Sequence, residues 1–329
     1  MTLFLVLSSM RGVTAADEAT AWLVVQPGYP GSTRDAEGFM RLFSSYLTER
    51  TSLGPLEGTY YNLPDDALHK LQARSPGFAL VSLGFYLKYR QQFGFEVRLV
   101  SEPADVFLIV GRESEIQVAA DLDGQEVVGG PLYEPGFLTR VVFRGRACVE
   151  RWQARPVLRT SRALRRLARG RYKAVVLTGR EFASLSRLSR GKKLEKVLQS
   201  DYYPAAVLVL IRPPKSKGSG SQGDSKSESE KSESDDVGDE PRKRTKKRTG
   251  RITTDPPAEV GGNRGLRAGA VQQVLTASQR TSLERAFLGM EEDLEAQDLL
   301  KTMGARGFKM VKPDWLKELE GQYDTVEKK

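Results

Sequence analysis

The stretch Ala104–Gly130, ADVFLIVGRESEIQVAADLDGQEVVGG, decides the fold class of this chain. The apolar residues of Asp105–Val110 predict a buried strand, which ends at the phrase GRES of Gly111–Ser114. A short polar helix follows, and Gly124 marks a turn before a second apolar strand at Glu126–Val128. The order of strand, helix and strand predicts part of an α/β sheet.

The residues on either side repeat this alternation. Phe39, Phe43 and Leu47 have the spacing of one apolar helix face. Strands are predicted at Ala21–Gln26, Glu57–Leu63, Phe78–Leu83, Glu96–Ser101, Pro156–Arg159, Ala174–Leu177 and Ala205–Ile211. Further helices are predicted from Pro64, over Gly84–Phe93 and Pro135–Phe143, and from the N-cap Ser161 to Gly170. Because strands alternate with helices, we expect mostly parallel sheets with helices on both faces.

The composition changes abruptly at Pro213–Gly265, where an acidic block precedes the basic run PRKRTKKR. So few apolar residues and so many charges cannot offset the entropy lost on ordering, so we expect a disordered insert. The pattern of a folded domain resumes at Leu266. There we expect a helix face of Leu283, Ala286, Phe287, Met290 and Leu294, a helix over Glu295–Met303 that ends at Gly304, and core contacts from Phe308, Trp315 and Leu319.

The side chains that carry most enzyme chemistry are scarce in this sequence. It has one cysteine and one histidine, too few for an internal disulfide or a metal site of His and Cys ligands. Nothing in the sequence next to His69 or Cys148 prepares a nucleophile, and there is no phosphate-loop or dinucleotide signature. We therefore expect neither catalysis, nor a cofactor, nor a bound metal.

The formal charge of +9 is concentrated, with fourteen Lys or Arg against two Glu between Arg155 and Lys196. Such a region either steers anions into a cleft or forms a solvated face that adheres to an acidic membrane or cell envelope, and the sequence leaves both open. At the other end of the chain, Met1–Ala16 combines a short apolar run with small residues. We interpret this segment as an export signal.

Three segments together resemble the type II periplasmic solute-binding proteins of phosphate, phosphite and phosphonate ABC importers, the PhnD-like family. Ala104–Gly130 is similar to the entry of the second lobe, where a strand ends in a phrase like VRxDSxI and DLKGKxVA follows. ALRRLARGRYKAVVLTGREF at 163–182 resembles a further segment of the family, and Leu275–Asp324 resembles its closing helices. The resemblance covers Ala21–Arg212 and Leu266–Asp324.

The resemblance implies a two-lobed α/β fold, each lobe a mostly parallel sheet flanked by helices. One lobe would comprise 17–103 and 266–329 and the other 104–205, with a return strand at 206–212 and the insert at 213–265. It also implies an exported protein that captures a small, anionic, phosphate- or phosphonate-like ligand between the lobes and delivers it to an ABC permease. No DNA partner is expected.

Ligands of this fold bind at strand carboxyl ends and helix N-termini that face the cleft. Four loops of this chain occupy such places. Their candidate ligand contacts are Tyr29, Ser32, Ser82, Tyr86, Tyr133, Thr178 and Arg180. We expect all four loops to face one cavity, with Tyr86 and Arg180 on opposite walls.

One loop departs from the family. Where oxyanion-binding relatives have a turn rich in Ser, Thr and Gly, this chain has GPLYEPG at Gly130–Gly136. Proline has no N–H to donate, and Glu134 would repel an anion. A cation, an amine-bearing solute or an apolar anion is then an alternative ligand. The rival function is an interaction protein whose charged insert binds a polyanion, the cell envelope or nucleic acid.

Replacing Pro213–Gly265 with a short Gly/Ser linker should leave the melting temperature nearly unchanged. The entropy of loop closure changes by only about 0.6 kcal/mol for each doubling of loop length. Thermal unfolding followed by circular dichroism checks this expectation. A fall of about ten degrees, equivalent to roughly 2 kcal/mol or more, would show that the insert packs on a lobe.

Overall fold

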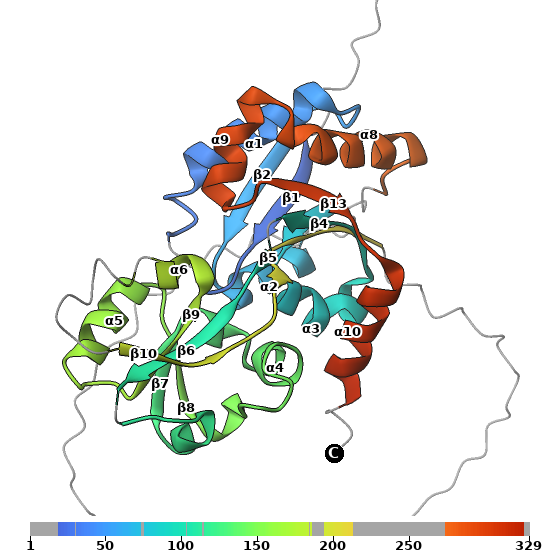
Figure 1. The fold of residues 1–329 in the computed structure, drawn as a ribbon. Coiled ribbons are helices and arrows are strands. Elements are labelled where there is room, and N and C mark those ends of the chain that lie inside the picture. The colour runs from blue at the N-terminus through green and yellow to red at the C-terminus, as the bar shows by residue number, and fades with distance from the viewer. Residues whose placement is uncertain are drawn as a thin grey trace, which may run out of the picture. The chain divides into compact units, whose positions relative to one another are not determined.

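The computed structural model describes residues 19–29, 31–73, 76–102, 104–113, 115–183, 185, 194–212 and 274–325. The predicted export signal and the predicted insert both lie outside these residues. The described chain forms two sheets flanked by helices, joined by a short two-stranded ladder (Figure 1). The predicted α/β fold class of two lobes is confirmed.

The first lobe is built on a six-stranded sheet with the order β13-β4-β12-β3-β1-β2. Its strands are β1 (Thr20–Val25), β2 (Leu56–Tyr61), β3 (Phe78–Val81), β4 (Phe95–Glu102), β12 (Val207–Ile211) and β13 (Gly307–Met310). β1 is parallel to β2 and β3, whereas β12 runs antiparallel between β3 and β4. The sheet thus combines the start of the chain with β12 and β13, which follow the second lobe.

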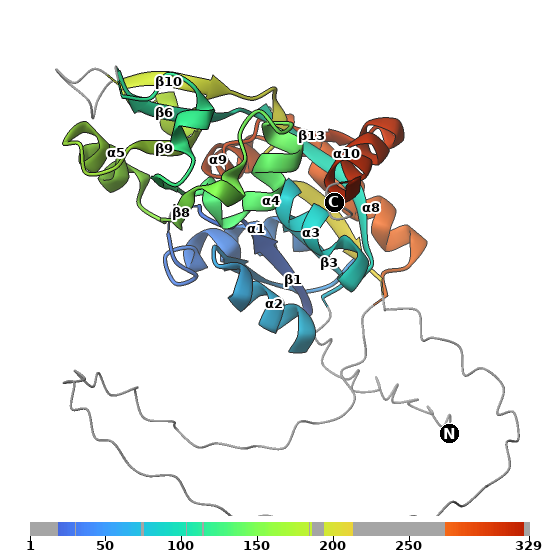
Figure 2. The ribbon, with the colours of Figure 1, turned by 90° about the horizontal axis from the view of Figure 1, so that it is seen from below.

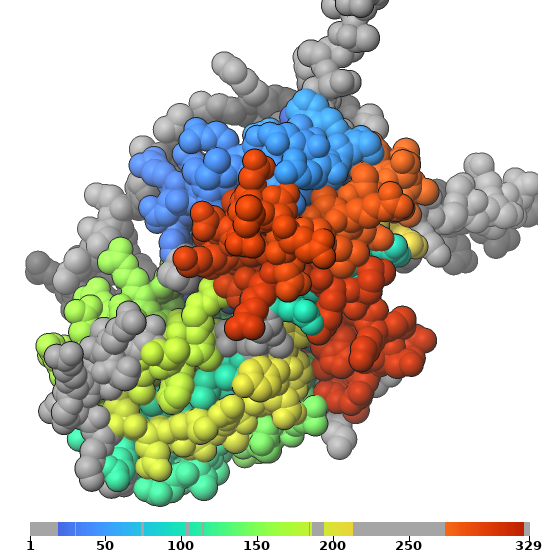
Figure 3. Space-filling model, turned by 45° about the horizontal axis from the view of Figure 1, so that its top comes forward, coloured from blue at the N-terminus to red at the C-terminus, as the bar shows by residue number. Residues whose placement is uncertain are grey.

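Six helices belong to this lobe. They are α1 (Glu37–Arg50), α2 (Pro64–Ala73), α3 (Leu83–Phe93), α8 (Ala277–Leu288), α9 (Leu294–Met303) and α10 (Pro313–Thr325). α8 and α9 lie beside α1, and the space-filling view shows this late segment (orange) against early residues (blue) (Figures 1 and 3). Beneath them Phe287 meets the rings of Phe43 and Phe308 at 5.7 and 4.9 Å between centroids.

The second lobe is built on a five-stranded sheet with the order β10-β6-β9-β7-β8. Its strands are β6 (Phe107–Arg112), β7 (Glu126–Gly129), β8 (Gln153–Pro156), β9 (Ala174–Thr178) and β10 (Leu194–Gln199). Its helical elements are η1 (Ala119–Leu122), η2 (Pro131–Tyr133), α4 (Pro135–Phe137), η3 (Leu138–Val142), η4 (Val149–Arg151), α5 (Thr160–Ala168) and α6 (Gly179–Ala183). β7 is parallel to β8 and β9, whereas β6 is antiparallel to β9 and β10.

Two passes of the chain join the sheets. β5 (Ala104–Asp105) follows β4, β11 (Tyr203–Pro204) precedes β12, and these two short strands pair antiparallel. The strand that follows each pass, β6 in one direction and β12 in the other, runs antiparallel to its neighbours. In the second sheet β6 alone runs against the other four strands, whereas in the first sheet β12 and the edge strand β13 both run against the other four.

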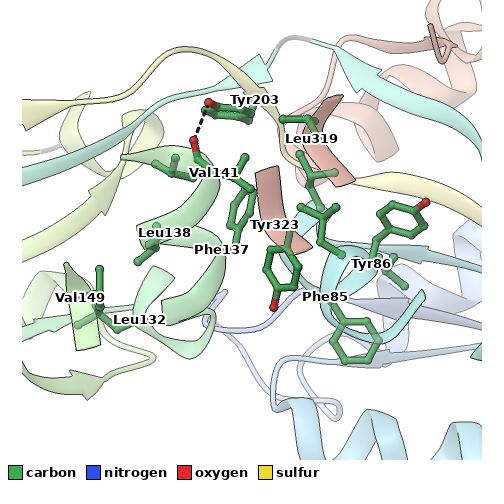
Figure 4. Packing of buried hydrophobic residues seen from close by; sticks show 14 of the residues in the cluster. Phe85, Tyr86, Leu132, Phe137, Leu138, Val141, Val149, Tyr203, Leu319 and Tyr323 are labelled. Atoms are coloured by element: carbon green, nitrogen blue, oxygen red, sulfur yellow. Dashed lines mark hydrogen bonds between the residues drawn. The ribbon is translucent and has the colours of Figure 1, made fainter. Parts of the chain in front are cut away.

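The last helix, α10, packs against both lobes. It lies next to α3 and α4 (Figure 2), and Leu319 and Tyr323 enter a core cluster that includes Phe85 and Phe137 (Figure 4). The guanidinium of Arg140 in η3 lies 5.0 Å from the ring centroid of Tyr323. The end of the chain thus contributes apolar contacts that hold the lobes together.

Three local predictions are wrong. The strand predicted at Pro156–Arg159 is β8, three residues earlier; its four residues are all exposed at the sheet edge, so it lacks the apolar signal of a core strand. Ser161 is not an N-cap, because α5 already begins at Thr160. Leu294 is 81% exposed, because a 3-10 turn and the N-cap Asp293 separate α8 from α9 and end the shared face.

None of the helices in the described residues is long and apolar enough to cross a membrane.

Phe287→Ala should lower the free energy of unfolding by about 3–5 kcal/mol, because it leaves a cavity among three packed rings. Urea unfolding measures the loss. Leu288→Ala is the matched control, since Leu288 follows in the same helix but is 37% exposed. If Phe287→Ala lowers the free energy of unfolding by no more than this control does, the residues after 274 do not complete the core of the first lobe.

Candidate ligand-binding cleft

A cavity of about 110 Å3 is lined by residues of both lobes. Pro27, Gly28 and Tyr29 reach it from the loop after β1, and Ser82 and Leu83 from the junction of β3 and α3. The second lobe contributes Phe107, Gly130, Glu134, Phe137, Thr178 and Arg180. The loops after β1, β3, β7 and β9 therefore converge on one space, as the carboxyl ends of parallel strands do.

Four of the predicted contact residues line this cavity: Tyr29, Ser82, Thr178 and Arg180. Ser82 is the N-cap of α3, and its Oγ accepts a hydrogen bond from the Phe85 N–H at 3.1 Å. Thr178 is the last residue of β9, and both its N–H and its hydroxyl donate to the carboxylate of Glu181. Ser82 and Thr178 are thus held by local capping contacts.

The other three predicted residues lie elsewhere. Ser32 is exposed, and its N–H and hydroxyl donate to Asp35 at 2.8 and 2.9 Å, which fastens the turn before α1. Tyr86 is buried (Figure 4). Its hydroxyl donates a hydrogen bond to Glu320 of α10. Because it stands one helical turn beyond the N-cap, its side chain enters the core under α10, so the predicted pairing of Tyr86 and Arg180 on opposite walls is wrong.

Tyr133 also misses the cavity. Its 3-10 turn places it in a separate groove of about 530 Å3 on the second lobe, beside Tyr172 and the arginines of β8 and α5. That groove is lined by four arginines, Arg155, Arg159, Arg162 and Arg166. Arg180 instead lines the cavity between the lobes. These four arginines of the basic stretch therefore line a groove of the second lobe and not the cavity between the lobes.

Glu134 also lines the cavity, although the sequence pattern indicated only that it would repel an anion. It precedes α4 in the second lobe, yet its Oε1 accepts a hydrogen bond from Ser82 of the first lobe at 2.5 Å. Lys88 attracts the carboxyl group from further along α3. Burial outweighs these contacts and raises the pKa of Glu134 to about 7.

Arg180 makes the opposite contact. Its Nη2 donates to the carbonyl oxygen of Met303, the last residue of α9, at 3.0 Å. Its guanidinium also lies 6.0 Å from the ring centroid of Tyr29 and packs onto Gly304, whose φ of 68° ends the helix. A cation of the second lobe therefore lies at the negative end of a helix dipole in the first lobe.

The backbones of the lobes meet beside these side chains. A Cβ added at Gly28 would overlap the carbonyl oxygen of Gly130, and one added at Gly130 would lie 2.6 Å from the carbonyl oxygen of Gly28. No larger residue allows this approach. The two glycines thus set how closely the rims of the cleft can come together.

Other polar groups near the cavity are used to build it. Glu181 of α6 accepts from Thr160 and Thr178, which ties α6 to the start of α5. Across the described ranges, no three His, Cys, Asp or Glu side chains cluster in a way that could hold a metal ion. The chemistry at the cavity is therefore that of hydroxyls, one guanidinium, carboxyl groups and aromatic rings.

Solved structures share this arrangement of two lobes. XAC2383 from Xanthomonas citri, solved bound to ATP, matches with a TM-score of 0.59 at 12% identity, covering 94% of this chain and 99% of that one. The binding component of an ABC phosphonate transporter from Pseudomonas aeruginosa matches with a TM-score of 0.57 at 11% identity, covering 94% of this chain and 88% of that one. PhnD1 from Prochlorococcus marinus, solved with methylphosphonate, matches with a TM-score of 0.57 at 10% identity, covering 94% of this chain and 99% of that one.

No protein-family model and no curated protein sequence matches this chain. The class that the structure defines is the two-lobed type II periplasmic-binding-protein fold. Within that class, the likeness to PhnD-like phosphonate-binding proteins supports the resemblance seen in the sequence. At 10–12% identity it is a likeness of fold.

Gly28→Ala should hold the lobes apart, because its Cβ meets the Gly130 backbone. Gly54→Ala is the matched control: the φ angles are 78° and 74°, so both variants bear a similar strain of about 1 kcal/mol, but Gly54 has open space around it. Small-angle X-ray scattering should show a larger radius of gyration for Gly28→Ala alone. Equal radii would mean that the glycine contact does not limit closure.

Proposed function

We propose that this chain is an exported solute-binding protein that holds a small ligand between its lobes and delivers it to an ABC permease. The observation that carries the proposal is the cavity lined by both lobes, because a ligand there gains contacts to both only when they close. The shared fold of the phosphonate-binding proteins supports it. Export is part of the proposal and rests on the predicted signal at Met1–Ala16.

Capture suits the cavity better than catalysis. The Ser82 hydroxyl already accepts from a helix N–H and donates to Glu134, so it serves as a cap. Glu181 is likewise occupied by two threonines. These contacts position side chains and give the site the few polar groups amid apolar walls that small-molecule sites use.

The size and lining of the cavity point to a small ligand with an anionic group. A cavity of about 110 Å3 suits a small ligand, since an engineered cavity of roughly 150 Å3 in another protein binds benzene. Arg180 offers hydrogen bonds to an anion, and the rings of Tyr29, Phe107 and Phe137 suit an apolar remainder. A small phosphonate has both parts.

A thermal-shift screen of small phosphonates, other organic anions and amines tests this proposal. We expect an anionic solute to stabilise the protein, and Arg180→Ala to weaken its binding by about 2–5 kcal/mol if the pair is buried. Arg165→Ala, on the exposed face of α5, is the control. The melting temperature without ligand separates lost binding from the lost contact to Met303. Stabilisation by amines alone would contradict the proposed ligand class.

A further inference from the structure

The N-terminus of α3 lies at the cavity and has a carboxyl group already seated on it. That group comes from Glu134 of the other lobe and accepts a hydrogen bond from the hydroxyl of Ser82, the N-cap of this helix. α3 has 11 residues, and its first backbone N–H groups have no partner within the helix. Such a terminus is the usual place for a ligand's anionic group.

The surrounding residues are shaped for this contact. A Cβ added at Gly84, in the first turn of α3, would lie 2.7 Å from the Glu134 carboxyl, so only glycine leaves room for it. Pro131 and Pro135 flank Glu134 in sequence, and a residue before proline has few backbone conformations. The side chain is therefore directed across the cleft by a stiff segment.

We propose that Glu134 is the specificity-determining residue of the cleft: its carboxyl group fills the anion position at the N-terminus of α3, so the lobes close on a group of the chain itself and free oxyanions are excluded there. The proposal rests on the proposed function only in taking the cavity as the ligand site. Its chemistry follows from the seated carboxyl group and the Ser82 hydroxyl that holds it.

The consequence for the ligand is a division of the cavity. Glu134 occupies the N-terminus of α3, whereas Arg180 lies at the C-terminus of α9 and also lines the cavity. A tetrahedral inorganic anion, polar on every side, has no donors left at the α3 end and meets a carboxyl group instead. The cleft therefore selects a solute whose single anionic group faces Arg180 and whose other end is apolar.

The test is a calorimetric titration with inorganic phosphate, and separately with sulfate, on the full chain. Glu134→Ala vacates the position while keeping the Ser82 hydroxyl and the Phe85 N–H. We expect it to bind phosphate at least about tenfold more tightly than the wild type, as expected when one charge-assisted hydrogen bond is gained. Glu134→Gln fills the same volume without the charge and should bind as weakly as the wild type.

Two results would overturn the proposal. One is phosphate binding by the wild type as tight as by Glu134→Ala. The other is an equal gain in Glu134→Gln, which would assign the exclusion to charge instead of occupancy. If Glu134→Ala does not fold, as judged by circular dichroism, Glu134→Ser takes its place, since serine also leaves the position vacant.

The outcome is separate from that of the solute screen. A gain of phosphate binding in Glu134→Ala, together with no ligand for the wild type, would uphold the role of Glu134 and contradict solute capture. A ligand found for the wild type, with no gain of phosphate binding in Glu134→Ala, would uphold solute capture and contradict the role of Glu134.

Discussion

The close approach of the two lobes at Gly28 and Gly130 is the constraint on which the rest of the cleft depends. It brings Glu134 to the N-terminus of α3 and Arg180 to the C-terminus of α9. The Arg180 contact pairs a cation with the negative end of a helix dipole, an arrangement worth roughly 0.3–1 kcal/mol, and up to about 2 kcal/mol when partly buried. Glu134 contributes its hydrogen bond with Ser82. Closure therefore has stabilising contacts that come from the chain alone.

These contacts explain why the cavity is small. In a binding protein that closes only on its ligand, the ligand supplies the contacts that the two lobes gain on closing. Here Glu134 and Arg180 already supply two of them, and α10 adds apolar packing against both lobes (Figure 4). A solute adds to a state that the protein already favours, so its affinity depends on the groups that remain, Arg180 foremost.

Much of the fold was predictable from the sequence, because its signals are local. The alternation of apolar strands and amphipathic helices predicted most of the central strands and longer helices, but not the strands β10 and β13 or the helices α6 and α10. The error at β8 arose because an exposed edge strand carries no apolar pattern. The reversed strands β6 and β12 depend on which sheet each segment joins, and periodicity does not report that.

The site was predictable in its loops but less so in its side chains. Strand ends located Tyr29, Ser82, Thr178 and Arg180, whereas Tyr86 was misplaced because one further helical turn moves a side chain from cleft to core. The sequence also indicates that the negative charge of Glu134 would repel an anion. Its bond to Ser82 joins residues 52 positions apart in different lobes, so only the structure reveals it.

The most direct test of closure on Glu134 is the inter-lobe distance in ligand-free protein between pH 5 and 9. Spin labels at Leu42→Cys and Arg165→Cys, with Cys148→Ser, allow it to be measured by pulsed dipolar spectroscopy. Since burial raises the pKa of Glu134 from 4.5 to about 7, the closed state binds its proton more tightly and should lose up to about 3 kcal/mol as the pH rises through this range.

The other charged groups near this carboxyl are Lys88 on α3 and Arg180 and Glu181 on α6, so Glu134→Gln is needed to isolate its titration. The account predicts a single short distance at pH 5, a population of longer distances that grows mainly as the pH rises from 5 to about 7, and no such change in Glu134→Gln. A wild-type distribution that does not change with pH, or one that changes equally in the variant, would contradict it.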